Sequence, residues 1–385
     1  MLNDDLNTLR KKNLYRVAEV ISSPSAAEIV IGKKRFINFS SNNYLGLATH
    51  PKVIGAAKAA LERWGAGSGA SRLLSGSLQI HADLEERLAW FKGEEASAVF
   101  SSGYLANLGV MTALLNEKDL VLLDRLNHAS LVDAARLSKA KLWVYPHKDV
   151  VELDRLLKKA SGFRRKLVVT DAYFGMDGDV APLDKILDIC ERNGALLMID
   201  EAHSTGVFGK TGHGLTEHFG LSGKIHVVMG TLSKALGSVG GFITGKKILR
   251  ETIVNRSKEF IYTTAPAPAA SAAALESLTI IGKEPGLRKK LWENVYFLRK
   301  GLKALGFNLM DSEGPIVPII IGDTAKALRA RDIFRKEGIF APAIRPPTVP
   351  KGTDRIRISL MATHTEDHLE KLLGILKKAR SKHGL

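Results

Sequence analysis

A single lysine in a glycine-rich stretch is the residue of this sequence best suited to covalent chemistry. Lys234 lies in GTLSKALGSVGG, at residues 230–241, between two short apolar runs. This order predicts a strand, a loop and a second strand. The hydroxyls of Thr231 and Ser233 could hold an anion, and the glycines permit close backbone approach. In such a pocket a lysine can have its pKa lowered for Schiff-base formation, although an ordinary lysine at a strand end fits the pattern too.

Polar side chains also follow most of the other short apolar runs. They are the turn at residues 101–104, Asp124 with His128, DAYFGMDGD at residues 171–179, and Asp200 with His203. Ligands of parallel sheets bind beyond the carboxyl ends of the strands, so we expect these groups at one edge. The free amides of residues 101–104, which precede a helix, suit a phosphate.

Each of these residues has a simpler structural interpretation when it is taken alone. A histidine after a strand can be a loop hydrogen-bonding group, and Asp200 can be the N-cap of a helix. His203, His213 and His218 lack zinc-type spacing, so we expect no metal site. The glycine-rich residues 65–76 lack the GK[ST] ending of a phosphate-binding loop, which argues against nucleotide binding.

The elements that must position these groups alternate between apolar runs and helical patterns. The runs span residues 97–100, 120–123, 142–145, 167–170, 196–199, 225–229 and 241–244. This alternation predicts an α/β fold with a mostly parallel sheet that is covered by helices. We expect an N-terminal segment over residues 1–50, a large domain over 51–280 and a smaller α+β domain over 281–385.

Two further segments carry polar groups outside the predicted sheet. Residues 6–17 are predicted to form an amphipathic helix that carries Arg16. The turn-rich residues 38–47 either present amides to a ligand or simply turn the chain. In the rigid loop AIRPPTVP, at residues 343–350, Arg345 can bind a carboxylate or form an ordinary salt bridge.

The bulk composition limits the class of protein. A formal net charge of +16 over 385 residues fits an acidic partner, such as a nucleic acid or an acidic carrier protein, or a solvated basic surface. No aromatic–basic interleaving indicates a nucleic-acid groove. The one cysteine, Cys190, favours a reducing cytoplasm. We expect no signal peptide and no membrane helix, because no apolar run reaches about 20 residues.

Several motifs together resemble those of the α-oxoamine synthase family of pyridoxal-phosphate (PLP) enzymes, nearly from end to end. They are SNNYLGL, GSGASRLLSG, SSGYLAN, LNHASLVDAARLS, IDEAHSTGVFG, TLSKALGSVGG, IYTTAPAP and RPPTVPKGTDRIRIS. The resemblance implies a large domain like that of aspartate aminotransferase, a smaller C-terminal domain, and a homodimer that builds its sites at the subunit interface.

The resemblance also implies catalytic roles for individual residues. Lys234 would carry PLP and act as the base, and Asp200 would pair with the pyridine nitrogen. His128 would stack over the ring, and His203 would bond the phenolic oxygen. Gly175 stands where many members have a cofactor-binding serine, so that contact is in doubt here.

Binding roles are implied for a larger set. The phosphate would be held by Gly103, Tyr104, Thr231 and, from a partner subunit, Thr264 or its neighbour Thr263. Asn42 and Arg345, together with His128, would orient the carboxylate of the amino acid. Arg16 and Thr348 would face the acyl substrate.

The RPPTVP loop and the Leu-Tyr-Arg at residues 14–16 are most similar to those of members that act in biotin biosynthesis. Those members condense L-alanine with a pimeloyl thioester, of coenzyme A or of a carrier protein, and release CO2 and the thiol. A glycine C-acetyltransferase is the alternative within the same chemistry. A PLP-dependent aminotransferase and a non-enzymatic anion-binding protein are alternatives from other classes, and the sequence does not distinguish alanine from glycine or serine.

Overall fold

The computed structural model describes residues 2–383, and the chain forms two compact units. The first unit comprises the chain up to Gly46, Met176–Asp179, and the chain from Lys289 onward. The second unit comprises Leu47–Gly175 and Val180–Arg288. Among the described residues, no helix combines the length and apolar character that crossing a bilayer requires. The same residues contain no group of three or more His, Cys, Asp or Glu side chains arranged to hold a metal ion.

A seven-stranded sheet is the centre of the second unit. Its strands are β3 (Ala96–Phe100), β4 (Leu120–Asp124), β5 (Lys141–Tyr145), β6 (Lys166–Asp171), β7 (Leu196–Asp200), β8 (Val227–Thr231) and β9 (Gly241–Gly245). Their order is β3-β9-β8-β7-β6-β4-β5, and β9 runs antiparallel to both of its neighbours. Each apolar run predicted from the sequence is therefore a strand, and β3, β4, β6, β7 and β8 all end at one edge.

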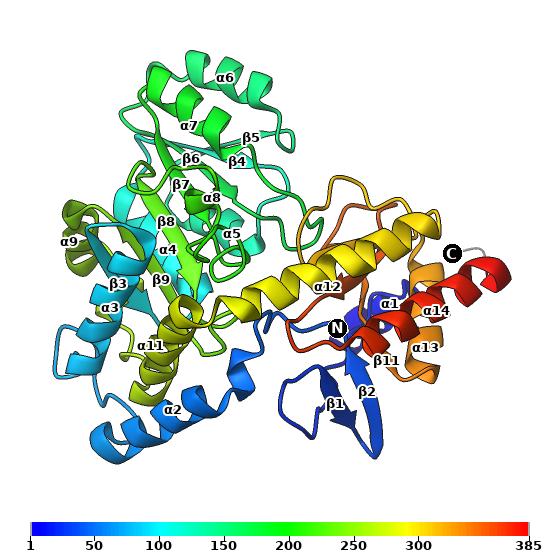
Figure 1. The fold of residues 1–385 in the computed structure, drawn as a ribbon. Helices are drawn as coiled ribbons and strands as arrows, with labels where there is room; N and C mark the ends of the chain where they lie inside the picture. The colour runs from blue at the N-terminus through cyan, green and yellow to red at the C-terminus, as the bar shows by residue number, and fades with distance from the viewer. Residues whose placement is uncertain (1, 384–385) are drawn as a thin grey trace. The chain divides into compact units, whose positions relative to one another are not determined.

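Helices surround this sheet in the second unit (Figure 1). They are α2 (Pro51–Trp64), α3 (Gln79–Lys92), α4 (Gly103–Leu114), α5 (Ala129–Leu137), α6 (Val150–Lys159), α7 (Leu183–Arg192), α8 (Leu215–His218), α9 (Lys247–Arg256), α10 (Lys258–Ile261) and α11 (Pro268–Lys283), with a 3-10 turn at Leu47–Thr49. Strand side chains such as Val169 and Met198 are fully buried in the core. Because the central strands are covered on both faces, their side chains are almost all apolar, which confirms the predicted α/β class, whereas the edge strand β5 keeps exposed residues such as Lys141 and Val144.

The first unit is an α+β structure with two small sheets. Its helices are α1 (Leu2–Lys11), α12 (Pro285–Ala304, which begins in the second unit), α13 (Thr324–Lys336) and α14 (Glu366–His383). One sheet joins β1 (Glu28–Ile31), β2 (Lys34–Asn38) and β11 (Ile339–Phe340), and the other joins β10 (Ile316–Ile320), β13 (Arg355–Ser359) and β12 (Ala343–Ile344). The N-terminal segment and the C-terminal part of the chain thus share one unit.

The N-terminal helix differs from the prediction. It ends at Lys11 instead of continuing to residue 17, so Arg16 lies beyond it in an irregular segment. Asn13 adopts a left-handed backbone with φ 56°, and the amide of Leu14 turns back to the carbonyl of Leu9 at 2.8 Å, which closes the helix. No residue of this helix is buried, so packing does not stabilise a longer one.

Candidate active site

Two aspartates lie next to each other at the carboxyl edge of the large sheet. β6 and β7 pair in parallel with Asp171 opposite Asp200, and both residues are buried. Asp200 accepts one hydrogen bond from the amide of Ala202 and one from Asn107 Nδ2, each at 2.9 Å. Burial, and after it the charge of Asp200, raises the pKa of Asp171 well above its ordinary value. Asp171 is therefore harder to ionise than an ordinary aspartate.

His128 and Lys234 belong to the same edge. His128 is the N-cap of α5, and its backbone amide donates to Asp171 Oδ2 at 2.9 Å. Lys234 follows β8 by three residues and is partly buried. Although His128 keeps an exposed surface, desolvation lowers its pKa. The carboxylate of Asp200 opposes this shift, whereas the charge of Lys234 adds to it. These charges act on the imidazole only at short range, so the predicted lysine, carboxylate and imidazole form one cluster.

An anion cradle lies where α4 begins. A Cβ atom at Gly103 would be 2.9 Å from Met229 Cε and 3.4 Å from Thr231 Oγ1, so the start of α4 lies close against β8. Thr231 Oγ1 lies 2.8 Å from Ser233 Oγ. The first amides of a helix have no intrahelical partner and carry partial positive charge. Amides and hydroxyls arranged in this way suit a phosphate group.

Two predicted phosphate contacts have additional interactions within the chain. The hydroxyl of Tyr104 donates to Asp133 Oδ2, and this bond raises the pKa of the phenol. The phenol is therefore engaged on α5, and the residue's contribution to the cradle is its backbone amide in the first turn of α4. Thr264 is exposed, and its backbone pairs with that of Ser71. Its carbonyl accepts a 3.4 Å bond from Ser101 Oγ, which places it beside the cradle.

The substitution of glycine for serine at residue 175 is linked to the position of His203. His203 is buried after β7, and a Cβ atom at Gly175 would lie 2.5 Å from its Nε2 atom. Real Cβ atoms do not approach so closely, so the imidazole occupies space that a larger residue would need.

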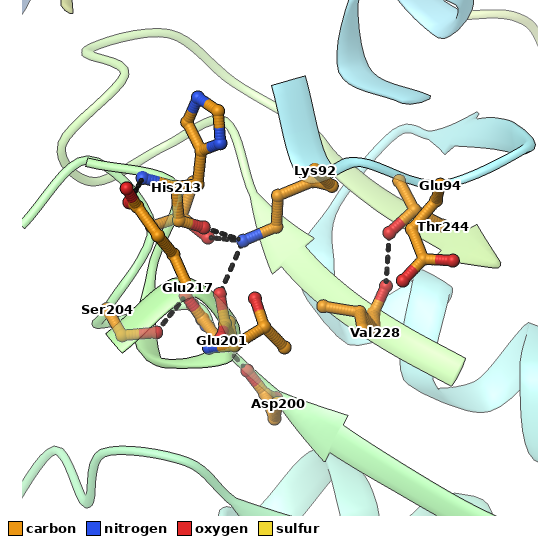
Figure 2. Close-up of polar contacts among 12 residues, drawn as sticks. Lys92, Glu94, Asp200, Glu201, Ser204, His213, Glu217, Val228 and Thr244 are labelled. Carbon is orange, nitrogen blue, oxygen red and sulfur yellow. Dashed lines mark hydrogen bonds and ion pairs between the residues drawn. The ribbon is translucent and has the colours of Figure 1, made fainter. Parts of the chain in front are cut away.

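A buried ion pair supports the turn that follows Asp200, and Figure 2 shows Lys92, Glu201 and Asp200. The side chains of Lys92 and Glu201 are both fully buried. Lys92 Nζ donates to Glu201 Oε2, to the carbonyl of His213 and, at 3.1 Å, to Thr205 Oγ1. Glu201 Oε1 also accepts a 2.6 Å bond from the amide of Thr216. The charges are fully hydrogen-bonded, which is the condition for a tolerable buried pair.

The first unit contains a pocket rich in arginine. Its volume is about 380 Å³, and its lining includes Tyr15, Arg16, Arg331, Arg345 and Thr348. Arg16 Nη2 donates to Thr348 Oγ1 at 2.9 Å, and Arg345 Nη2 donates to the carbonyl of Tyr15 at 2.6 Å. Burial, and after it the charges of Arg16 and Arg331, lowers the pKa of Arg345, whose buried Nε has no hydrogen-bond partner among the described residues. A guanidinium group with an unsatisfied donor suits an anionic ligand.

Asn42 is paired with an arginine that the sequence analysis did not select. Arg357 Nη2 donates to Asn42 Oδ1 at 3.0 Å, and its Nη1 donates to Ser359 Oγ at 2.7 Å. The sequence analysis grouped Asn42 with Arg345, but Arg345 lines the pocket with Arg16 and Thr348. A buried arginine in the middle of a strand, as in RIRIS, is the signal that could have identified Arg357.

Asn107 and Ser130 are also functional candidates that the sequence analysis missed. Both are buried, and they form a chain of hydrogen bonds between Asp200 and His128. Asn107 follows Gly103 by four residues in SSGYLAN, which places the two on one side of α4. That spacing, together with a polar residue in an apolar helix, was the available signal.

Comparisons with known proteins identify the family of this chain. The family model for aminotransferase class I and II matches residues 34–376. The chain therefore belongs to the aminotransferase class I and II family. It is 44% identical to the 8-amino-7-oxononanoate synthase of Thermoanaerobacter pseudethanolicus, covering 98% of this chain and 96% of that relative. It is 40% identical to 8-amino-7-oxononanoate synthase 1 of Bacillus subtilis, with the same coverage.

Solved structures show the same fold. A serine palmitoyltransferase of S. paucimobilis with bound PLP-myriocin aldimine is 33% identical, with a TM-score of 0.94 over 100% of this chain and 97% of that chain. The 8-amino-7-oxononanoate synthase of Francisella tularensis is 28% identical, with a TM-score of 0.79 over 91% of this chain and 99% of that one. The family and the fold class expected from the sequence motifs are thereby confirmed.

Proposed function

We propose that this protein is a PLP-dependent acyltransferase that condenses L-alanine with a pimeloyl thioester to give 8-amino-7-oxononanoate, and that it acts as a homodimer. Relatives of that name are 40–46% identical over nearly the whole chain. The observation that carries the choice of acyl substrate is the arginine-rich pocket of the first unit.

The residues of the second unit fit PLP. Asp200 supplies a buried carboxylate for a pyridinium nitrogen, and the start of α4 with Gly103 and Thr231 suits a phosphate. Lys234 supplies the amine for covalent attachment. When bound, PLP supplies an electron sink for negative charge at the α-carbon of the amino acid.

The residues of this chain perform the remaining tasks. Lys234 Nζ accepts the α-proton of alanine. Arg357 and Asn42 bind the amino-acid carboxylate, because the hydrogen bond between them fixes the orientation of the planar guanidinium group. The α-carbon then attacks the thioester carbonyl, the carbon–sulfur bond breaks and the thiol leaves. Loss of the carboxylate as CO2, followed by protonation at the α-carbon, completes the product.

The pocket supports a dicarboxylic acyl chain. Arg16, Arg345 and Thr348 offer donors to a terminal carboxylate, and Arg345 has a buried Nε available for one. A methyl-ended chain of the same length would leave the buried Nε of Arg345 unsatisfied, which costs about 1–3 kcal/mol. An acetyl group has no terminal carboxylate and gains nothing from these donors. The pocket therefore favours this synthase over a glycine C-acetyltransferase.

The deciding experiment compares acyl donors of equal length. Thiol release would be followed with alanine and pimeloyl-CoA, heptanoyl-CoA or acetyl-CoA, and then with glycine or serine in place of alanine. We expect pimeloyl-CoA with alanine to give the highest kcat/KM, and the preference over heptanoyl-CoA to shrink in Arg345→Met. A preference for glycine with acetyl-CoA would assign the protein to the C-acetyltransferases. Lys234→Ala should lose both turnover and the visible absorption band of bound PLP.

A further inference from the structure

We propose that Ser130 and Asn107 are positioning residues that connect His128 to Asp200 and lock the imidazole as the tautomer that is protonated at Nε2. The proposal rests on the proposed function only for its catalytic meaning. The hydrogen bonds themselves are a property of the second unit alone.

The direction of the first bond follows from the chemistry of its partners. Asn107 lies 2.9 Å from Asp200 Oδ2, and a carboxylate oxygen can only accept. The atom of Asn107 at this position must therefore be its amide nitrogen. The other side-chain atom, Oδ1, is buried without a hydrogen-bond partner among the described residues, so the donations of the nitrogen alone orient this amide.

Because the nitrogen of Asn107 is identified, the directions of the next two hydrogen bonds, to Ser130 and to His128, follow. Asn107 Nδ2 also lies 2.9 Å from Ser130 Oγ, to which it donates its second hydrogen. Ser130 Oγ lies 2.8 Å from His128 Nδ1. The serine oxygen already accepts from Asn107, so its own hydrogen is available for the histidine. The amide of Ser130 donates to the same ring nitrogen at 3.3 Å, so Nδ1 receives two donors.

A ring nitrogen that accepts two hydrogen bonds carries no proton. In a neutral imidazole the proton then resides on Nε2. Protonating Nδ1 as well would break the bond from Ser130. The backbone of His128 is held separately, through the bond of its amide to Asp171. Position and tautomer are thus fixed by different groups.

For the reaction, the fixed tautomer means that His128 presents a hydrogen-bond donor at Nε2. Nε2–H, on the ring edge away from Ser130, can donate to a substrate oxygen, whereas an Nδ1-protonated ring would present a lone pair there. The connection also means that Asp200 polarises the amide that orients the serine. The carboxylate thereby has a second role, in addition to pairing with a pyridinium nitrogen.

The test is ¹⁵N NMR of selectively histidine-labelled holoenzyme, with the signals of residue 128 identified by their absence in His128→Asn. In the wild type we expect an unprotonated Nδ1 and a protonated Nε2 at neutral pH. Ser130→Ala should give averaged signals from both tautomers, and Ser130→Thr, which keeps a hydroxyl, should restore the wild-type pattern. Asn107→Leu should also give averaged signals, because the serine hydroxyl loses its fixed direction.

Ser138→Ala is the matched control, because Ser138 is a buried serine at the end of the same helix. Its hydroxyl donates to the carbonyl of Ala135 and accepts from the amide of Ala140. This substitution should leave the signals of residue 128 unchanged. In Ser130→Ala we expect turnover to fall roughly 10- to 100-fold, as when partners that orient histidine ligands are removed. A protonated Nδ1 in the wild type, or unchanged signals in Ser130→Ala, would overturn the proposal. Failure of turnover with pimeloyl-CoA in the wild type would instead overturn the proposed function, since the NMR signals do not depend on it.

Discussion

Gly175 and His203 occupy complementary space in the second unit: a Cβ atom on the glycine would lie 2.5 Å from Nε2 of the histidine and 3.0 Å from its Cδ2 atom. Glycine at this position therefore does more than remove a serine hydroxyl, because it also leaves room for the imidazole ring. Because residue 175 has no side chain, the imidazole of His203 can pack there. A change at either residue of the candidate cofactor site should therefore affect the other.

Gly175→Ser should weaken the binding of PLP, because the new side chain displaces His203. Overpacking of this kind costs about 1–3 kcal/mol, which corresponds to roughly a 5- to 150-fold higher Kd. The measurement is a titration of the apoenzyme with PLP, followed by absorption. Gly162→Ser is the matched control, since a Cβ atom there meets no atom within 4 Å, and its Kd should equal that of the wild type. Tighter binding in Gly175→Ser would show that the serine restores a contact instead.

Arg357 and Arg345 should affect different substrates. Arg357→Lys removes the planar group that bonds both Asn42 and Ser359, so we expect the KM for alanine to rise roughly 10-fold. Arg345→Lys changes the pocket that Arg16 and Thr348 line, so the KM for pimeloyl-CoA should rise instead. Steady-state kinetics with each substrate varied in turn separates the two effects. If Arg345→Lys changed the alanine KM alone, the two assignments would have to be exchanged.

Removing the buried ammonium of Lys92 should destabilise the protein strongly. Lys92→Met leaves Glu201 buried without its charged partner, a change that costs about 3–5 kcal/mol. Urea unfolding of the holoenzyme measures this loss. Arg192→Met is the control, because its pair with Asp188 is exposed and is worth at most about 1 kcal/mol. The double variant Lys92→Met with Glu201→Gln should recover part of the loss, and an equal or larger loss would mean that packing, not charge, dominates.

His364 should make stability depend on pH. Burial lowers its pKa to about 3, while its Nδ1 accepts from the amide of Met361 and its Nε2 lies 3.0 Å from the carbonyl of Asn38. Below the ordinary pKa of 6.5 the unfolded chain binds a proton that the folded protein does not, so stability falls as the pH falls from 6.5 towards 3.

The measurement is urea unfolding at pH 7.5 and pH 5.5. Between these two pH values, the titration of His364 in the unfolded chain should lower the free energy of unfolding of the wild type by about 1.4 kcal/mol. His364→Gln cannot titrate, so it should be less stable at pH 7.5 but lose about 1.4 kcal/mol less on acidification. Equal losses in the two proteins would show that His364 is charged in the folded state.

The sequence by itself determined the sheet and the residues at its edge. Apolar runs of four or five residues between helical patterns can be buried on both faces only as strands of a covered, mostly parallel sheet. The residue after each run then lies at the carboxyl edge, so Asp200, His128 and Lys234 were predictable from their positions alone. The spacing of apolar and polar residues is a local property, and it suffices for this part of the fold.

Only the tertiary structure decided which side chains bond to which. Asn42 is 315 residues from Arg357, and Asn107 is 93 from Asp200, so no local pattern relates them. The early end of α1 was missed because its amphipathic pattern continues past residue 11, whereas no packing is present to stabilise a longer helix. Hydrogen-bond direction, such as that from Asn107 through Ser130 to His128, depends on which donors and acceptors meet at about 3 Å. The distances between these donors and acceptors depend on how α4, α5 and β7 pack together. This packing is a property of the whole fold and not of any local sequence pattern.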